Sequence, residues 1–92
     1  WVMAIGNPFG LGGTVTVGAE ARGLAANWQS PGSVGSVLAE LASTGSADVD
    51  ALMKGMQWTV AVEEGIGSGQ EMAARRDMDL LMSHVIDALK EG

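Results

Sequence analysis

Apolar side chains recur at three- and four-residue intervals through residues 46–92, the spacing of an amphipathic helix. The pattern breaks at Gly65 and Gly67, so it predicts two helices, the first ending near Glu64 and the second near Glu91. Because the break between them is short, we expect the two helices to form an antiparallel hairpin. The core face predicted for the second helix consists of Ala74, Met78, Leu81, Met82, Val85 and Leu89.

Two serines mark the expected starts of these helices. Ser46 is a good N-cap for the first helix, and Asp48 and Asp50 then fall in its first turn, where negative charge is favourable. Ser68 and Glu71 have the spacing of a capping box, which predicts that the second helix starts there.

The N-terminal part of the chain has the pattern of two short strands. Residues 1–5 form a brief apolar run, and residues 14–17 are β-branched throughout. Proline and glycine between them, in the segment 6–13, are typical of a turn. We therefore expect a β-hairpin, which must pack on other elements because two strands alone are barely stable.

The middle of the chain is less regular. Residues 19–29 are ambiguous, whereas residues 34–43 read as a short helix that ends at Thr44 and Gly45. The whole pattern predicts an α+β fold that is mostly α: a short N-terminal hairpin followed by two or three helices, the last two antiparallel. We expect one small domain over 1–92, composed of a β segment (1–18), a loop with a short helix (19–45) and the helical hairpin (46–92).

The first helix of the hairpin is apolar on two sides. Its core stripe is expected to contain Val49, Leu52, Met53, Met56 and Val60, and its second stripe contains Ala51, Gly55, Trp58 and Val62. A helix with two apolar sides is normally buried on both, so either the N-terminal strands or another molecule should cover Trp58. Leu80 on the last helix also points away from the predicted core. These five residues, Ala51, Gly55, Trp58, Val62 and Leu80, are the candidate interaction residues.

Composition narrows the possible partners. The chain has 92 residues, a formal net charge of −6, no cysteine and one histidine. Nucleic acid and anionic membranes are therefore unlikely ligands, and neither a disulfide nor a thiolate or multi-histidine metal site can form within one chain. No apolar run is long enough for a membrane span. The acidic charge would suit a basic partner, although it also simply favours solubility.

The residue types needed for catalysis are present but poorly placed. Ser83 and His84 are neighbours on the last predicted helix and so point about 100° apart. His84 and Asp87 could touch, which most simply describes a solvated histidine beside a carboxylate. The acidic pairs Glu63–Glu64 and Asp77/Asp79 fall on predicted charged faces without a cleft. We expect no enzymatic activity and no cofactor or metal, and we expect the methionines on the helical stripes to fill the core.

The first eighteen residues carry one specific motif. The stretch WVMAIGNPFGLGGTVTVG, with its turn Gly6-Asn7-Pro8-Phe9-Gly10, resembles the HtrA (DegP-like) family of trypsin-like serine proteases. The resemblance implies a segment of the second β-barrel, located between the triad aspartate and the Gly-Asn-Ser-Gly-Gly nucleophile segment. Beyond residue 18 this chain departs from the family and contains no such nucleophile segment. The resemblance therefore carries no catalytic residue onto this chain.

These observations leave two main functional hypotheses. The first is a small non-enzymatic interaction or assembly subunit that binds a protein partner, or itself, through an apolar helical surface. The alternative is a catalytically inactive fragment, remnant or chimera that carries an HtrA-type segment. The chain begins with Trp1 rather than methionine, so we expect it to be processed, truncated or joined from parts. A weaker third hypothesis is an acidic inhibitor of a basic site.

Overall fold

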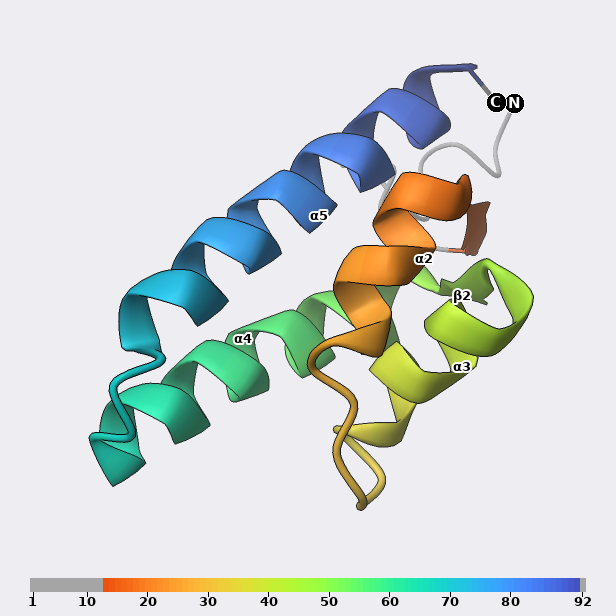
Figure 1. Ribbon diagram of the computed structural model, residues 1–92. Helices are drawn as coiled ribbons and strands as arrows, with labels where there is room; N and C mark the ends of the chain where they lie inside the picture. The colour runs from red at the N-terminus through yellow and green to blue at the C-terminus, as the bar shows by residue number, and fades with distance from the viewer. Residues whose placement is uncertain (1–12, 92) are drawn as a thin grey trace.

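The computed structural model describes residues 13–91, and most of these residues are helical (Figure 1). The elements in chain order are β1 (Thr14–Thr16), α2 (Ala19–Ala26), α3 (Ser36–Thr44), β2 (Ser46–Asp48), α4 (Val49–Ile66) and α5 (Glu71–Glu91). This confirms the predicted α+β class with mostly helical content and a final helical pair. The described residues contain four helices, because the ambiguous segment 19–29 forms α2 over much of its length.

The two strands are far apart in the sequence. β1 pairs with β2 in an antiparallel sheet in which Val15 lies opposite Ala47, and both side chains are buried. The sequence pattern predicts that the strand at 14–17 pairs with residues 1–5, which lie outside the described residues. Within the described residues, its partner is a segment some thirty residues later, which the sequence pattern assigns to the start of a helix.

The start of α4 differs accordingly from the prediction. Asp48, rather than Ser46, is the N-cap, and its Oδ2 accepts a hydrogen bond from the backbone N–H of Ala51 at 2.9 Å. Ser46 belongs to β2, where its hydroxyl lies 2.9 Å from that of Thr16 on β1. At its other end α4 continues through Gly65 and ends at Ile66, because Gly67 supplies the left-handed conformation that terminates it.

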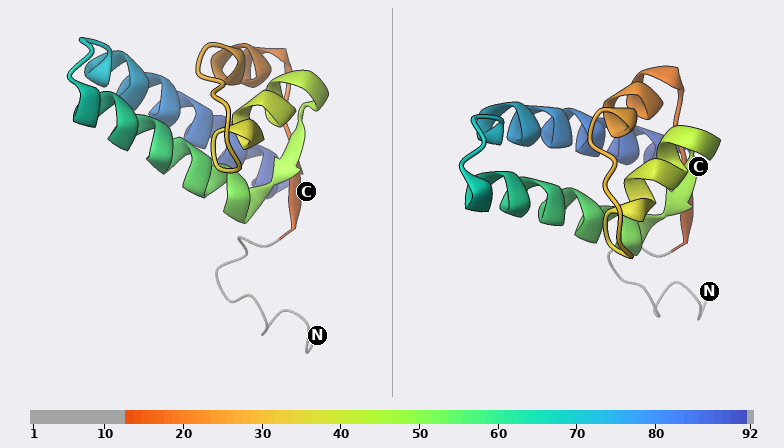
Figure 2. Two further views of the ribbon diagram at one scale, coloured as in Figure 1. Left: turned by 90° about the horizontal axis from the view of Figure 1, so that it is seen from below. Right: turned by 60° about the horizontal axis from the view of Figure 1, so that its bottom comes forward.

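The helices form two layers. α4 and α5 are antiparallel neighbours joined by a short connection, and they diverge toward the end where the strands, α2 and α3 gather (Figure 1). α2 packs on α5 and α3 packs on α4, so the shorter pair covers one face of the longer pair (Figure 2). No helix within residues 13–91 has both the length and the apolar character that crossing a membrane requires.

The core lies where these layers meet. The largest fully buried side chains are Leu38, Leu41, Leu52, Leu81, Val49 and Val85. The predicted core face of α5 is confirmed at Ala74, Met78, Leu81 and Val85, whereas Met82 and Leu89 at its edge are half-buried. Arg22 joins the two helices of the shorter layer, because its guanidinium on α2 donates to the backbone carbonyls of Ala42 (3.3 Å) and Ser43 (2.8 Å) near the end of α3.

Candidate functional site

The second apolar face of α4 is divided by contacts within the chain. Gly55 is buried against α3: a Cβ placed on it would lie 2.3 Å from Cγ1 of Val37 and 3.1 Å from the carbonyl oxygen of Val34. The absence of a side chain at Gly55 therefore allows another backbone to approach closely, and that backbone belongs to the same chain. Ala51, one turn earlier, is exposed.

Trp58 and Val62 continue this face and are half-buried. Trp58 lies against the α2–α3 connection, with its Cζ3 3.1 Å from where a Cβ on Gly35 would stand. The α2–α3 connection thus covers part of Trp58. The two covers expected from the sequence were the N-terminal strands and another molecule. Trp58 and Val62 line a small, mostly polar pocket together with Asn27, Trp28, Gln29, Ser30, Thr59 and Glu63.

Leu80 is separate from these residues. It lies on α5 and remains 48% exposed, in a shallow hollow shared with Met72, Arg75, Arg76 and Asp79. The structure therefore does not bring the five predicted interaction residues into one surface. Gly55 is covered, Trp58 and Val62 share a pocket, and Leu80 lines a different hollow.

A third hollow, an apolar groove, runs between α4 and α5. It is lined by Met53, Met56, Gln57, Val60, Ala61, Glu64, Arg75, Met78, Asp79 and Met82, and we call it the methionine groove; its volume is about 320 Å³. Met56 and Met78 form its buried floor, as the sequence analysis expected for all four of these methionines. Met53 and Met82 are only half-buried, so they line the open walls rather than the core.

The groove faces away from α2. On α5, the side that meets α2 is marked by Asp77, which bonds Trp28, and by His84, whose Nε2 is 3.9 Å from Oε2 of Glu20. Each residue of a helix is rotated by about 100° from the one before it, so Asp79 lies about 200° from Asp77, and Met82 about 200° from His84. Asp79 and Met82 are therefore on the other side of α5. The methionine groove is therefore the face of the α4–α5 pair that the shorter helices leave open.

Charged side chains stand at the rim of this groove. Glu64 of α4 pairs with Arg75 of α5 across one end, and both side chains are largely exposed. Asp79 and Gln57 also line it. The groove thus combines an apolar floor and walls with a polar rim. This arrangement suits an amphipathic segment whose apolar side chains enter the groove while its polar side chains stay in water.

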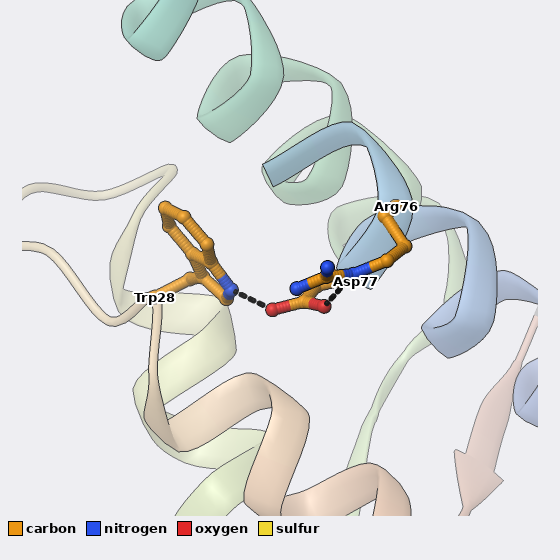
Figure 3. A network of polar contacts seen from close by, with 3 residues as sticks. All are labelled: Trp28, Arg76 and Asp77. Carbon is orange, nitrogen blue, oxygen red and sulfur yellow. Dashed lines mark hydrogen bonds and ion pairs between the residues drawn. The ribbon is translucent and has the colours of Figure 1, made fainter. Parts of the chain in front are cut away.

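One buried polar contact was not predicted. Asp77, expected on a charged helix face, is only 8% exposed, and its Oδ2 accepts a hydrogen bond of 2.8 Å from Nε1 of Trp28 (Figure 3). Arg76 donates to the other carboxylate oxygen at 3.2 Å. The prediction that Asp77 lies on a charged, solvated face is wrong, because Trp28 in the turn after α2 contacts its carboxylate.

The other side chains considered for catalysis lie apart from one another and form no common cleft. Nε2 of His84 lies 3.9 Å from Oε2 of Glu20 on α2, and both His84 and Asp87 line a small pocket with Thr16 and Gly18. Glu63 accepts a hydrogen bond from the hydroxyl of Ser68. Among residues 13–91, no three side chains of the metal-binding types form a cluster that could hold an ion.

Comparison with known proteins gave no relative. No protein-family model matches the chain, and neither the curated proteins nor the solved structures contain a match. The resemblance to the HtrA family lies largely in residues 1–12, outside the described part of the chain, and stays a sequence-based hypothesis. The geometry of the described residues is therefore the basis for inferring function.

Proposed function

We propose that this chain is a non-enzymatic interaction domain that binds a basic amphipathic helix of a partner protein in the methionine groove. The observation that carries the proposal is the open groove itself, with Met53, Val60 and Met82 half-exposed along its walls. Helix-binding grooves take the apolar face of a partner helix, and flexible methionine side chains adapt to its shape.

The charge of the domain favours a basic partner. The chain carries a net charge of −6, and Glu64 and Asp79 stand at the groove rim. Arg75 at the same rim is paired with Glu64, so that pair is neutral and the net negative charge of the rim comes from Asp79. Lysine or arginine on the polar side of a bound helix would meet this negative field, which increases the association rate and selects against acidic competitors.

A peptide titration tests the proposal. A designed amphipathic helix of leucine and lysine is added to the protein, and the methyl NMR signals of the methionines are followed. We expect the signals of Met53 and Met82 to shift, and that of Met72 to stay unchanged because this residue is 85% exposed in a different hollow of α5. A leucine–glutamate peptide with the same apolar pattern should bind at least about tenfold more weakly.

Matched variants locate the binding surface. Met82→Lys places a charge on the groove wall and should weaken binding of the leucine–lysine peptide by at least about tenfold. Met72→Lys makes the same change on the exposed outer hollow and should leave the affinity within about twofold. Equal losses in both variants, or equal binding of a scrambled peptide, would contradict the proposal.

The same two variants also test whether the protein associates with itself through the groove. Light scattering of the protein without peptide reports its mass over a range of concentrations. A dimer that Met82→Lys dissociates and Met72→Lys does not would mean that a second copy fills the groove. That result would replace the basic helix as the proposed partner.

A further inference from the structure

The small pocket beside Trp58 combines two indoles with a carboxylate. Its walls come from the turn after α2 and from the C-terminal half of α4, and its volume is about 210 Å³. This is below the roughly 300–1,000 Å³ of pockets that hold drug-sized ligands, so the pocket suits a small chemical group. The side chains that decide which group fits are Trp28, Trp58 and Glu63, and each of them is half-buried.

Both indoles are held in place within the chain. Trp28 donates its Nε1–H to Asp77 of α5 at 2.8 Å, which anchors one edge of its ring (Figure 3). Trp58 lies against Gly35 in the α2–α3 connection. Because neither ring has to be ordered when a ligand enters, binding costs little conformational entropy. The carboxylate that accepts from Trp28 also polarises this indole, which makes the face of its ring more negative.

The charge in and around the pocket is negative. Glu63 contributes its carboxylate, which accepts a hydrogen bond from the hydroxyl of Ser68 and keeps its charge. Among residues 13–91, no basic side chain forms an ion pair with Glu63 and none lines the pocket. A cation in the pocket is therefore attracted both by this carboxylate and by the negative faces of the indole rings.

The indole walls select among cations. A lysine ammonium has three N–H donors and is strongly hydrated, so it loses hydrogen bonds to water when it enters a pocket walled by aromatic rings. A trimethylammonium group has no N–H to satisfy and presents methyl groups around a positive charge. Tryptophan is the best aromatic partner for such a cation, and a nearby carboxylate adds to the attraction.

We infer that the pocket formed by Trp28, Trp58 and Glu63 binds a methylated ammonium group. The group belongs either to a small molecule such as choline or to a methylated lysine side chain, because both present the same trimethylammonium head. The pocket shares no lining residue with the methionine groove. This inference therefore concerns a second site and does not depend on the function proposed above.

A titration of the full chain with choline chloride tests the chemistry. The readout is the NMR signals of the indole N–H groups of Trp28 and Trp58, with sodium chloride at the same concentrations as the reference. Dimethylbutanol, in which a carbon atom replaces the charged nitrogen of choline, is the matched control ligand. We expect choline to shift both signals saturably and the alcohol to bind at least about tenfold more weakly. Equal binding of the alcohol would overturn the inference.

A peptide comparison separates the two sources of the group. A short peptide that carries one trimethyllysine is titrated beside the same peptide with an unmodified lysine. If the trimethylated peptide binds at least about tenfold more tightly than both the unmodified peptide and choline, the ligand is a methylated protein. If choline binds at least as tightly as the trimethylated peptide, the ligand is the small molecule. Equal binding of the two peptides, or no shift with either peptide or choline, would remove the inference.

A pair of charge variants tests the role of the carboxylate. Glu63→Gln removes the charge with almost no change of shape and should weaken choline binding at least about fivefold. Glu40→Gln makes the same change on the exposed surface of α3 and should leave the affinity within about twofold. Equal effects of the two variants would contradict binding beside Glu63.

Variants of Trp58 test the aromatic wall. Trp58→Leu keeps an apolar side chain without an aromatic face and should weaken choline binding at least about tenfold, whereas Trp58→Phe keeps a smaller aromatic face and should weaken it less. Urea unfolding shows which variants are folded at the start of the titration. If Trp58→Leu does not fold, Trp58→Phe and Glu63→Gln still test the site. A folded Trp58→Leu, or failing that Trp58→Phe together with Glu63→Gln, that binds choline like the unaltered chain would overturn the inference.

Discussion

The indole N–H of Trp28 donates a 2.8 Å hydrogen bond to the carboxylate of Asp77, across a sequence separation of 49 residues. The contact joins the turn after α2 to the middle of α5, so it fixes the shorter helical layer on the longer one (Figure 3). Its acceptor is a carboxylate with little access to water, and such a group depends strongly on its donors.

Trp28→Phe should therefore destabilise the fold by about 1.5–3 kcal/mol, the range for hydrogen bonds to charged groups. The measurement is the free energy of unfolding from urea titration. Asp79→Ala, an exposed carboxylate two residues further along α5, is the matched control and should stay within about 0.5 kcal/mol. If Trp28→Phe behaves like the control, the indole N–H does not contribute to stability.

Gly55 should resist substitution even though it lies inside a helix. Alanine normally favours a helix interior by about 1 kcal/mol over glycine. At Gly55 the new Cβ would meet Val37 at 2.3 Å, so α3 must move, and we expect a net loss of about 1–3 kcal/mol. Urea unfolding of Gly55→Ala measures this loss.

Gly65 provides the control on the same helix. Nothing lies within 4 Å of a Cβ placed there, so Gly65→Ala should be neutral or stabilising by up to about 1 kcal/mol. Adding Val37→Ala to Gly55→Ala removes the clashing methyl groups, so the two changes together should cost less than the sum of the single ones. Strict additivity would show that Val37 is not the obstacle.

The helical hairpin was predictable because the spacing of apolar residues within each helix indicates it. Leu81 and Val85 recur at helical spacing, and burial of one face follows from that period. The strand at 46–48 was not predictable in the same way. Ser46, Ala47 and Asp48 have little β-propensity, and only the distant strand β1 holds them extended.

The candidate site was predictable only in part. Met53 and Met82 belong to the predicted stripes, but the helical period alone cannot show that α2 and α3 pack on only one face of the α4–α5 pair. The burial of Asp77 was hidden for a similar reason, because its donor Trp28 lies in the turn after α2, 49 residues earlier in the chain. The close packing of Gly55 against α3 is likewise a tertiary contact that the helical period alone cannot show.

Asp48 should be an important cap for α4. Its carboxylate accepts the backbone N–H of Ala51, one of the groups that the helix itself leaves unpaired. Asp48→Ala should lower stability by about 1 kcal/mol, whereas Asp48→Asn, which keeps an accepting oxygen, should lower it less. Asp50→Ala in the same first turn loses only a favourable charge and should cost a few tenths of a kcal/mol in the urea titration. Equal effects at 48 and 50 would contradict the cap.

Trp58 should contribute to folding rather than to association. Its indole lies against Gly35 in the α2–α3 connection, so its cover is supplied within the chain. Because it is only half-buried, Trp58→Ala should cost about 2 kcal/mol, less than the 3–5 kcal/mol typical of a fully buried tryptophan. Urea unfolding gives the loss, and light scattering gives the mass of the variant.

Gly35→Ala changes the other partner of the contact with Trp58. Its Cβ would lie 3.1 Å from the indole and 2.7 Å from the carbonyl oxygen of Ser30, so the connection must shift and stability should fall. Combined with Trp58→Ala, part of this crowding disappears, and the two losses should not add fully. Removing an internally packed side chain destabilises the monomer itself. If Trp58→Ala instead leaves the stability of the monomer unchanged and dissociates an oligomer, the indole is covered by a second molecule in solution.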